Sequence, residues 1–357
     1  MSEHGGNVLE MALKIGTDAE NIIDFSANIN PLGMPDSLKT AIIEQLARAE
    51  RYPDVEYRQL HSALARAHHC LPENIMAGNG ATELIYAVVQ HLQPRSALLL
   101  TPGFAEYRRA LQRVGCQIHN YAMSEADGYQ PNERLLDVLV QLRPDCLFLA
   151  TPNNPTGLMP DAALLQAIVQ CCHQYQIALI VDEAFIDFLP DYQGLIPQLA
   201  EFPHLYILRS LTKFFAIPGL RLGYLLSGNL AGIQQMKQQR EPWTINAFAA
   251  LAGEIILDDQ PYIQATHEWL AEQRPWLYQH LAALPALQVW PGCANYIFLC
   301  CLRPEIDLQQ ALLQHHILIR HCANYPGLSR DYYRVAIKSA ADNQRLIIAL
   351  QQVLGHG

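Results

Sequence analysis

Short apolar runs alternate with amphipathic stretches through the middle of this sequence. Four such runs occupy residues 97–101, 146–150, 177–182 and 205–208. Each has the length of a strand and is apolar enough to be buried on both faces. The stretches between them have one apolar face at helical spacing, as residues 161–175 do. This alternation predicts an α/β fold with a mostly parallel sheet, in which ligands bind at the carboxyl ends of the strands.

The two ends of the chain follow other patterns. Residues 1–35 contain Asn-Pro and Pro-x-Gly turn signals, which indicate an irregular arm that is not part of the core. Beyond residue 243 a long helical segment leads into strand-like runs and short helices. We therefore expect an N-terminal arm (1–35), a large domain (36–243) and a smaller α+β domain (244–357) that packs with the arm.

Composition limits the classes of function. Half of the 357 residues are hydrophobic and 16% are charged, so a large core is expected and long disorder is not. The net charge of −10 argues against nucleic acid as a partner. No apolar run reaches about 18 residues and no signal-peptide pattern appears, so no membrane partner is expected. The nine cysteines lack Cys-x-x-Cys spacing, which favours free thiols in a reducing cytoplasm and no metal site.

The segment 209–224 contains the most distinctive chemistry. Lys213 follows an apolar run in a turn, with hydroxyl residues before it and apolar residues after it. A lysine that loses hydration in such a setting loses proton affinity and becomes an amine nucleophile. Ser210 and Arg221 could hold an anion beside it, and an amine next to an anion site is what a Schiff base to pyridoxal phosphate (PLP) requires. The alternative is that Lys213 reaches the surface and Arg221 makes an ordinary ion pair.

A phosphate-binding turn is predicted where glycines open a helical run. Gly80, Ala81 and Thr82 precede the amphipathic residues 84–92. Glycine lets the backbone approach an anion, and the free amides at a helix N-terminus favour negative charge. Most isolated Gly-x-Gly sequences mark only a turn, so this motif counts only in combination with others.

Asn154, Asp182 and Lys213 each follow a predicted strand and complete such a combination. Together with Gly80 and Arg221 they give the motifs Asn-Pro-x-Gly, Asp-Glu-Ala, Ser-x-x-Lys and Arg-x-Gly in this order. The order resembles the fold type I PLP-dependent enzymes of the class I and II aminotransferase kind, over nearly the whole chain. The resemblance implies that fold, with PLP bound to Lys213 as a Schiff base.

The resemblance also implies a role for each residue. Asp182 would face the pyridine nitrogen and keep it protonated, while Asn154 would donate to the ring O3′. Phe104 would stack on the ring. The cofactor phosphate would be held by Gly80, Ala81, Thr82, Ser210 and Arg221. The alternatives are a helix cap for Asp182, a turn-stabilising side chain for Asn154 and a core aromatic for Phe104.

Tyr52 lies in a Tyr-Pro-Asp turn. In enzymes of this family the tyrosine of such a turn often reaches the phosphate of the neighbouring subunit's cofactor. The resemblance therefore implies a homodimer, with Tyr52 as a cofactor-binding residue across the subunit boundary.

Phe185 departs from the common aminotransferase pattern, in which a tyrosine at this position hydrogen-bonds O3′. Its presence argues against plain transamination. Five segments further resemble one branch of the superfamily, the L-threonine-O-3-phosphate decarboxylases of cobalamin biosynthesis, which are close relatives of histidinol-phosphate aminotransferases. These segments are residues 4–7, 24–33, 101–107, 182–188 and 322–328. The implied reaction converts L-threonine O-3-phosphate into (R)-1-amino-2-propanol O-2-phosphate and CO₂.

A phosphorylated amino acid carries a carboxylate and a phosphate, and the planar fork of arginine suits both. The resemblance implies that Arg334 holds the α-carboxylate, and that Arg320 holds the phosphate with the N-terminal arm. The other implied substrate contacts are His4, Gly5, Asn28 and Asn154. Without the resemblance, Arg320 would be interpreted as part of a surface ion pair and His4 as part of a disordered terminus.

Two other functions are compatible with these motifs. A histidinol-phosphate aminotransferase would share the fold and a phosphorylated substrate, but would remove a proton in place of CO₂. A PLP-binding regulator would use the fold to sense a ligand, but such proteins usually carry an added DNA-binding segment. We expect no such segment within the first 35 residues.

Overall fold

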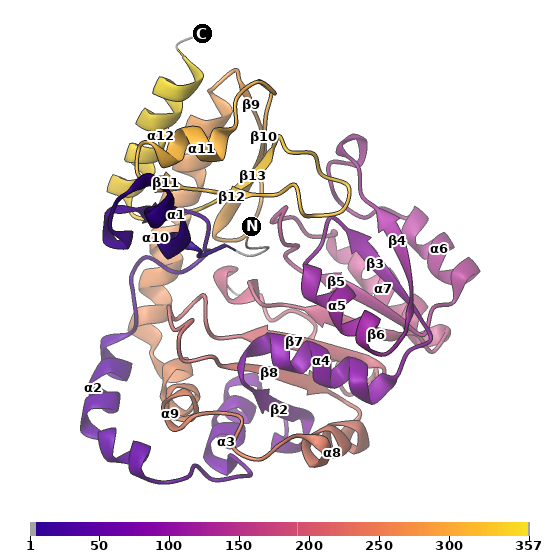
Figure 1. The fold of residues 1–357 in the computed structure, drawn as a ribbon. Helices are drawn as coiled ribbons and strands as arrows, with labels where there is room; N and C mark the ends of the chain where they lie inside the picture. The colour runs from indigo at the N-terminus through magenta and orange to yellow at the C-terminus, as the bar shows by residue number, and fades with distance from the viewer. Residues whose placement is uncertain (1–4, 191, 356–357) are drawn as a thin grey trace.

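The computed structural model of the chain describes residues 5–190 and 192–355. Its largest element is a seven-stranded sheet in which five neighbouring strands run parallel, while β8 is antiparallel to both of its neighbours (Figure 1). In spatial order the strands are β2 (Ile75–Gly78), β8 (Gly223–Ser227), β7 (Leu205–Ser210), β6 (Ala178–Asp182), β5 (Cys146–Ala150), β3 (Ser96–Thr101) and β4 (Gln117–Ala122). The prediction of a mostly parallel sheet is confirmed.

Both faces of this sheet are covered, because successive side chains of a strand point to opposite sides. In β3, Leu98 and Leu100 belong to one buried cluster while Ala97 and Leu99 belong to another. The first cluster includes apolar side chains of α3 (Arg58–His68), α6 (Arg134–Leu142), α7 (Ala162–Gln174) and α9 (Ala247–Ile255). The second includes those of α4 (Gly80–Leu92), α5 (Ala105–Arg113) and α8 (Leu230–Gln239). Continuous apolar runs are therefore the expected sequence of these strands.

Three strands of the sheet, β8, β4 and β2, lie outside the four predicted runs. The edge strand β4 has mostly exposed or half-buried residues, and its sequence mixes polar and apolar side chains without a clear period. Strand β2 has only four residues and runs directly into the glycine turn before α4. Strand β4 lacks the apolar signal of the buried strands because it lies at the sheet edge, and β2 lacks it because it is short.

A second sheet of four antiparallel strands is built from the C-terminal part of the chain (Figure 1). Its spatial order is β12 (Arg320–His321), β13 (Tyr332–Ala336), β10 (Tyr296–Cys301) and β9 (Leu287–Trp290). The long helix α10 (Gln260–Ala282) contains Pro275, and it accompanies this sheet together with α11 (Leu308–Leu313) and α12 (Ala340–Leu354). Although only one residue separates them, β11 (Ile317–Leu318) and β12 pair with different partners.

The prediction that the first 35 residues are irregular and outside the core is wrong. They contain the helix α1 (Val8–Ile15) and the short strand β1 (Ile23–Asp24), which pairs in parallel with β11. Met11 and Ala12 of α1 are buried against Leu313 and Leu318, so α1 lies beside α11 and β11 (Figure 1). The turn signals lie at residues 30–33, and a short amphipathic helix that ends at the left-handed Gly16 precedes them.

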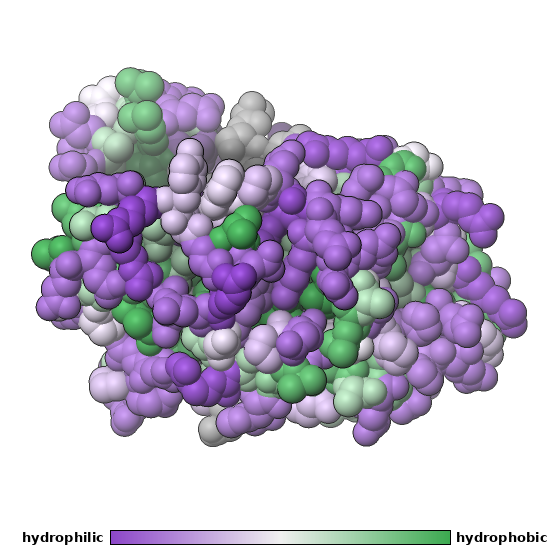
Figure 2. All heavy atoms as spheres, turned by 90° about the horizontal axis from the view of Figure 1, so that it is seen from below, coloured by the Kyte–Doolittle hydropathy of each residue, from purple (hydrophilic) through white to green (hydrophobic). Residues whose placement is uncertain are grey.

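The face of the molecule seen from below is mostly polar (Figure 2). Viewed from below, hydrophilic residues dominate and the hydrophobic ones form separate small areas (Figure 2). Among the residues that the structure describes, no helix is both long and apolar enough to cross a bilayer. Helix α2 (Asp36–Glu44) illustrates the pattern, with Leu38 buried and most of its other side chains exposed.

Candidate active site

Lys213 lies just past the carboxyl end of β7, at the edge where the parallel strands end. Its Nζ donates to Ser210 Oγ at 3.0 Å and stands 5.6 Å from the ring centroid of Phe185. Loss of hydration lowers the pKa of Lys213 to about 8; the Asp182 carboxylate opposes this shift, while the Arg221 and Arg334 guanidinium groups add to it. The amine is therefore partly neutral near physiological pH, as a nucleophile must be.

Asp182 ends the neighbouring strand β6 and is held by two donors. Tyr107 Oη donates to Asp182 Oδ2 at 2.6 Å, and the Ala184 amide donates to Oδ1 at 2.9 Å. Tyr107 is buried and stacks on Phe148 with 4.8 Å between ring centroids. A carboxylate that accepts two hydrogen bonds is held in place.

The predicted phosphate turn is present at the start of α4. Gly80 has φ +79°, and a Cβ on it would collide with the Arg221 guanidinium. Gly223 lies opposite Ser210 in the β7–β8 ladder, and a Cβ on Gly223 would come within 2.5 Å of Ala81 N. Two missing side chains thus bring the helix N-terminus, Ser210 and Arg221 together around bare backbone, which favours an anion.

Asn154 connects the large sheet to the small one. It lies in the loop after β5, and its Oδ1 accepts hydrogen bonds from Arg334 Nη1 at 2.5 Å and from Tyr325 Oη at 3.2 Å. Two donors on one oxygen determine which end of the amide is Oδ1, so the Asn154 NH₂ group faces the other way.

Arg320 and Arg334 lie directly opposite each other in the β12–β13 ladder. Each is only 6% exposed. Residues in this relation project from the same face, with about 5 Å between Cβ atoms, and like charges there repel. The other contacts of Arg334 are the Ser26 carbonyl, at 2.8 Å from Nη2, and the face of the Tyr296 ring. Arg320 Nη2 also donates to Asn324 Oδ1 at 2.8 Å. Two guanidinium groups on one face supply donors that suit anionic groups.

The N-terminal arm reaches the same place. Gly5 lies against the Ser26 backbone so closely that a Cβ would clash with its carbonyl, and the Gly6 amide donates to Ser26 Oγ at 2.8 Å. Asn28 is buried, and its carbonyl accepts a hydrogen bond from Asn295 at 2.9 Å. His4 lies outside the described residues. Gly5 thus contacts Ser26, whose carbonyl accepts from Arg334, and Asn28 follows two residues later in the chain.

Several buried polar atoms on this side have no partner. Within residues 5–190 and 192–355, Arg334 Nε, Asn28 Oδ1 and Asn295 Oδ1 are buried without a hydrogen bond. Buried polar groups are normally paired. Together with the anion-binding turn and the reactive amine, these atoms suit PLP and a polar substrate.

The remaining predicted residues have less distinctive surroundings. Thr82 occupies the first turn of α4, and Phe104 precedes α5 with its ring edge-on to Tyr107 at 5.6 Å. Phe185 is buried, packs edge-on to Tyr296 and brings no hydroxyl to the site.

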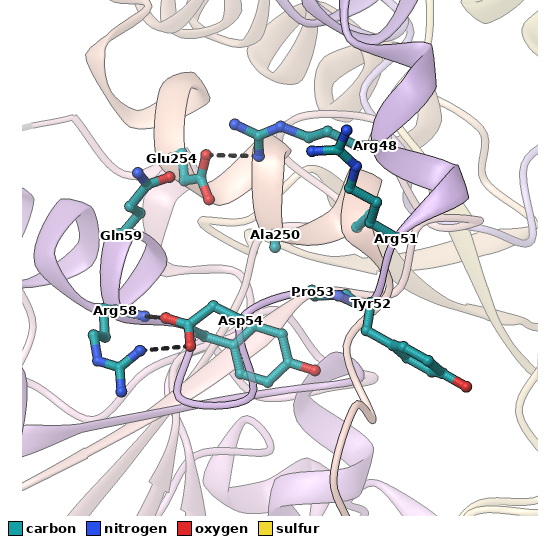
Figure 3. A pocket seen from close by; sticks show the side chains of 11 residues that line it. Arg48, Arg51, Tyr52, Pro53, Asp54, Arg58, Gln59, Ala250 and Glu254 are labelled. Atoms are coloured by element: carbon teal, nitrogen blue, oxygen red, sulfur yellow. Dashed lines mark hydrogen bonds and ion pairs between the residues drawn. The ribbon is translucent and has the colours of Figure 1, made fainter.

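Tyr52 belongs to a different part of the surface. It is 81% exposed, its ring lies 4.6 Å from that of Trp243, and it lines a pocket of about 450 Å³ (Figure 3). The pocket also holds the Arg48–Glu254 and Arg58–Asp54 ion pairs. No contact described in the structure joins Tyr52 to Lys213, so a single chain does not bring it to the other predicted residues.

Three tyrosines of the site were not predicted as site residues. Tyr107 and Tyr325 lie within the segments 101–107 and 322–328 that carried the family resemblance, and Tyr296 is on β10. Tyr296 Oη donates to the Asn153 carbonyl at 2.7 Å. The available signal was the presence of Tyr107 and Tyr325 within these two segments. A buried aromatic residue is by itself typical of any core, so this signal did not single them out.

The fold and the site define the class. The chain belongs to the aminotransferase class I and II family, whose model matches residues 20–351. It is 55% identical to the threonine-phosphate decarboxylase of Salmonella typhimurium over 99% of this chain and 97% of that protein. It is also 29% identical to the adenosylcobalamin biosynthesis bifunctional protein CobDQ of Leptospira interrogans, over 99% of this chain and 41% of that protein. The crystal structure of the histidinol-phosphate aminotransferase from Clostridium acetobutylicum superposes with a TM-score of 0.86 at 29% identity, covering 92% of this chain and 98% of that one.

Proposed function

We propose that this chain is a PLP-dependent carboxy-lyase. Its substrate is L-threonine O-3-phosphate, and its products are (R)-1-amino-2-propanol O-2-phosphate and CO₂, for the cobalamin nucleotide loop. The 55% identity to a threonine-phosphate decarboxylase and the similarity to CobDQ support this assignment. The structural observation that carries it is the pairing of Arg320 with Arg334 beside a reactive lysine.

The two arginines match the two charges of the substrate. Arg334 would hold the α-carboxylate. It donates a hydrogen bond to Asn154, and its positive charge helps to lower the pKa of Lys213. Arg320, with Gly5, Asn28 and the N-terminal arm, would hold the phosphate. A substrate with a carboxylate and a phosphate would present one anionic group to each of the two arginines.

The cofactor-holding residues follow from the same geometry. Ser210, Arg221 and the backbone of Gly80, Ala81 and Thr82 would hold the PLP phosphate. Asp182 would pair with the protonated ring nitrogen, Asn154 would donate to O3′, and Phe104 would lie against the ring. When bound, PLP supplies an aldehyde that condenses with amines and a ring that accepts an electron pair from a breaking bond.

Lys213 would then carry the proton. An amine with a pKa of about 8 exists in both protonation states near neutral pH, so its Nζ can return a proton to the α-carbon after CO₂ has left. Arg334 holds the carboxylate until that departure, and the buried tyrosines around Asn154 exclude water. Phe185 has no hydroxyl, so Asn154 alone would donate to O3′, as expected for a departure from plain transamination.

The larger organisation is part of the same proposal. The arm (1–35), the large domain (36–243) and the small domain (244–357) are proposed as its units. Tyr52 and Trp243 form an exposed aromatic pair, which supports a homodimer in which Tyr52 reaches the partner's cofactor phosphate. All nine cysteines are free thiols, which supports a reducing cytoplasm.

The deciding experiment measures CO₂ release from O-phospho-L-threonine by the PLP-loaded protein without any 2-oxo acid. Release of many CO₂ molecules per active site is expected. No release, combined with amino transfer from histidinol phosphate to a 2-oxo acid, would identify a histidinol-phosphate aminotransferase and overturn the proposal.

A further inference from the structure

Tyr325 occupies a position between the two arginines of the site. It lies in the loop that joins β12 to β13, and its backbone is held on both sides. The Tyr325 amide donates to the Cys322 carbonyl at 3.0 Å, and the Tyr325 carbonyl accepts from Leu328 at 3.1 Å. Its side chain is 6% exposed and belongs to an aromatic cluster with Tyr129, Trp290, Phe298 and Tyr332. The loop is therefore a fixed element of the small sheet.

Both parts of the Tyr325 side chain contact the site. The ring lies 5.6 Å from the Arg320 guanidinium, while the hydroxyl donates to Asn154 Oδ1 at 3.2 Å. The same Asn154 oxygen accepts from Arg334. One tyrosine thus touches the arginine proposed for phosphate directly and the arginine proposed for carboxylate through one shared oxygen.

This arrangement has a consequence for Asn154. Its amide could rotate by a half-turn and present oxygen in place of nitrogen to a ligand. Two donors on Oδ1 oppose that rotation, because a rotated NH₂ group would meet the Tyr325 hydroxyl and the Arg334 guanidinium as another donor. The Tyr325 hydroxyl could turn its proton away from a rotated amide, but the Arg334 guanidinium could not. Arg334 therefore requires the observed orientation of the Asn154 amide, and the hydrogen bond from Tyr325 stabilises it further.

We propose that Tyr325 is a positioning and specificity-determining residue, which fixes the Asn154 amide and separates the phosphate subsite from the carboxylate subsite. The proposal rests on the proposed function of this site. It predicts two separable effects. The hydroxyl orients Asn154 toward the cofactor, and the ring keeps Arg320 at the distance that a phosphate on the β-carbon requires. The substrates selected are amino acids that carry an anionic group at that position.

Two variants separate these effects. Tyr325→Phe removes only the hydroxyl and keeps the ring, so it is expected to fold. Tyr325→Leu removes the aromatic face beneath Arg320. The matched control is Tyr332→Phe, because Tyr332 belongs to the same aromatic cluster but its hydroxyl bonds Tyr129 and Glu125 instead.

The first measurement is the visible absorbance of the bound cofactor across a pH titration, which requires no turnover. Tyr325→Phe is expected to shift the midpoint of this titration and to lower kcat about 3- to 10-fold, the range of one lost hydrogen bond, with little change in KM. Tyr332→Phe is expected to leave the midpoint and kcat unchanged. An unshifted midpoint in Tyr325→Phe would overturn the positioning role.

The second measurement compares binding of O-phospho-L-threonine with binding of L-threonine. Tyr325→Leu is expected to lose about 10-fold of the preference for the phosphorylated ligand, while Tyr325→Phe retains it. Unchanged preference in Tyr325→Leu, or equal loss in Tyr325→Phe, would contradict the specificity role. If Tyr325→Leu does not fold, Tyr325→Phe still decides the positioning role, and a lost preference in that variant still contradicts the specificity role. If the wild-type protein releases no CO₂ while the Tyr325 variants still give these shifts, the proposed reaction is rejected and the role of Tyr325 is kept.

Discussion

The Tyr107 hydroxyl donates a 2.6 Å hydrogen bond to Asp182, and both groups are buried. A hydrogen bond to a charged group contributes about 1.5–3 kcal/mol to folding, and its loss leaves a buried carboxylate oxygen without a donor. Tyr107→Phe is therefore expected to lower the free energy of unfolding of the cofactor-free protein by about this amount. Urea denaturation measures it. Tyr86→Phe is the control, because its hydroxyl bonds Glu106 nearer the surface, and an equal loss in both variants would contradict the special role of the Asp182 contact.

Covalent attachment of PLP should depend on the protonation of Lys213. Because its pKa is lowered to about 8, the neutral amine becomes more abundant as pH rises from 7 to 9, and the attachment rate should rise with it. The rate is followed by the visible absorbance after mixing protein with PLP. Lys213→Ala should give no such band at any pH, and a normal band in this variant would refute the assignment of Lys213.

Gly80→Ala should weaken PLP binding. The new Cβ would meet the Arg221 guanidinium and would also be strained at a φ of +79°. Gly16→Ala is a matched control, since Gly16 has φ +70° but open space around it. Both variants should lose about 1 kcal/mol of stability from backbone strain, but only Gly80→Ala should release PLP during dialysis. Equal retention of PLP would argue against the turn as the phosphate site.

Arg334→Ala should reduce kcat/KM for O-phospho-L-threonine a hundredfold or more, because loss of one partner of a buried charge pair costs about 3–5 kcal/mol. Arg334→Lys should recover only part of this loss, since a lysine cannot reproduce the planar fork. Steady-state kinetics measure both. Arg330→Ala, a change at an arginine that pairs with Asp331 on the surface, should leave kcat/KM unchanged. Unchanged turnover and KM in Arg334→Ala would remove this residue from the site.

His61 should make the fold sensitive to acid. Its Nε2 accepts a hydrogen bond from the Ala77 amide at 3.2 Å, and burial lowers its pKa to about 4. Because the folded-state pKa lies below the unfolded value of about 6.5, this contribution to stability is complete above pH 6.5 and is lost as pH falls toward 4.

The full effect of His61 is about 3 kcal/mol. Urea midpoints between pH 7 and 4 should fall less steeply in His61→Gln than in the wild type. Burial also lowers the pKa of His68, to about 3. The urea midpoint of His61→Gln should therefore still fall somewhat as pH decreases. Identical slopes in the two proteins would contradict the role of His61.

The placement of site residues that depends only on local chain geometry was predictable from sequence. Lys213, Asp182 and Asn154 each follow a buried apolar strand, and parallel strands bring their ends to one edge whatever the details of packing. The glycine turn before α4 was recognisable for the same reason, since it needed only a short motif at a helix start.

Other features depended on partners far apart in the chain. Tyr325 acts on Asn154 across a separation of 171 residues, and no local pattern announces such a contact. The pairing of Arg320 with Arg334 depended on the register of β12 and β13, which a two-residue strand does not reveal. The burial of Phe25 depended on hydrogen bonds from its amide to Leu318 and from Ala336 to its carbonyl, so the arm could not be placed from its turn signals.

The strand β1 makes the two ends of the chain interdependent. Ser26 and Asn28 obtain their partners Arg334 and Asn295 from the last quarter of the sequence. A ribosome synthesises the chain from its N-terminus, so these first residues obtain their partners in the candidate site only after nearly the whole protein has been made. The large sheet can assemble during synthesis, whereas the ability to bind substrate arises only at its end.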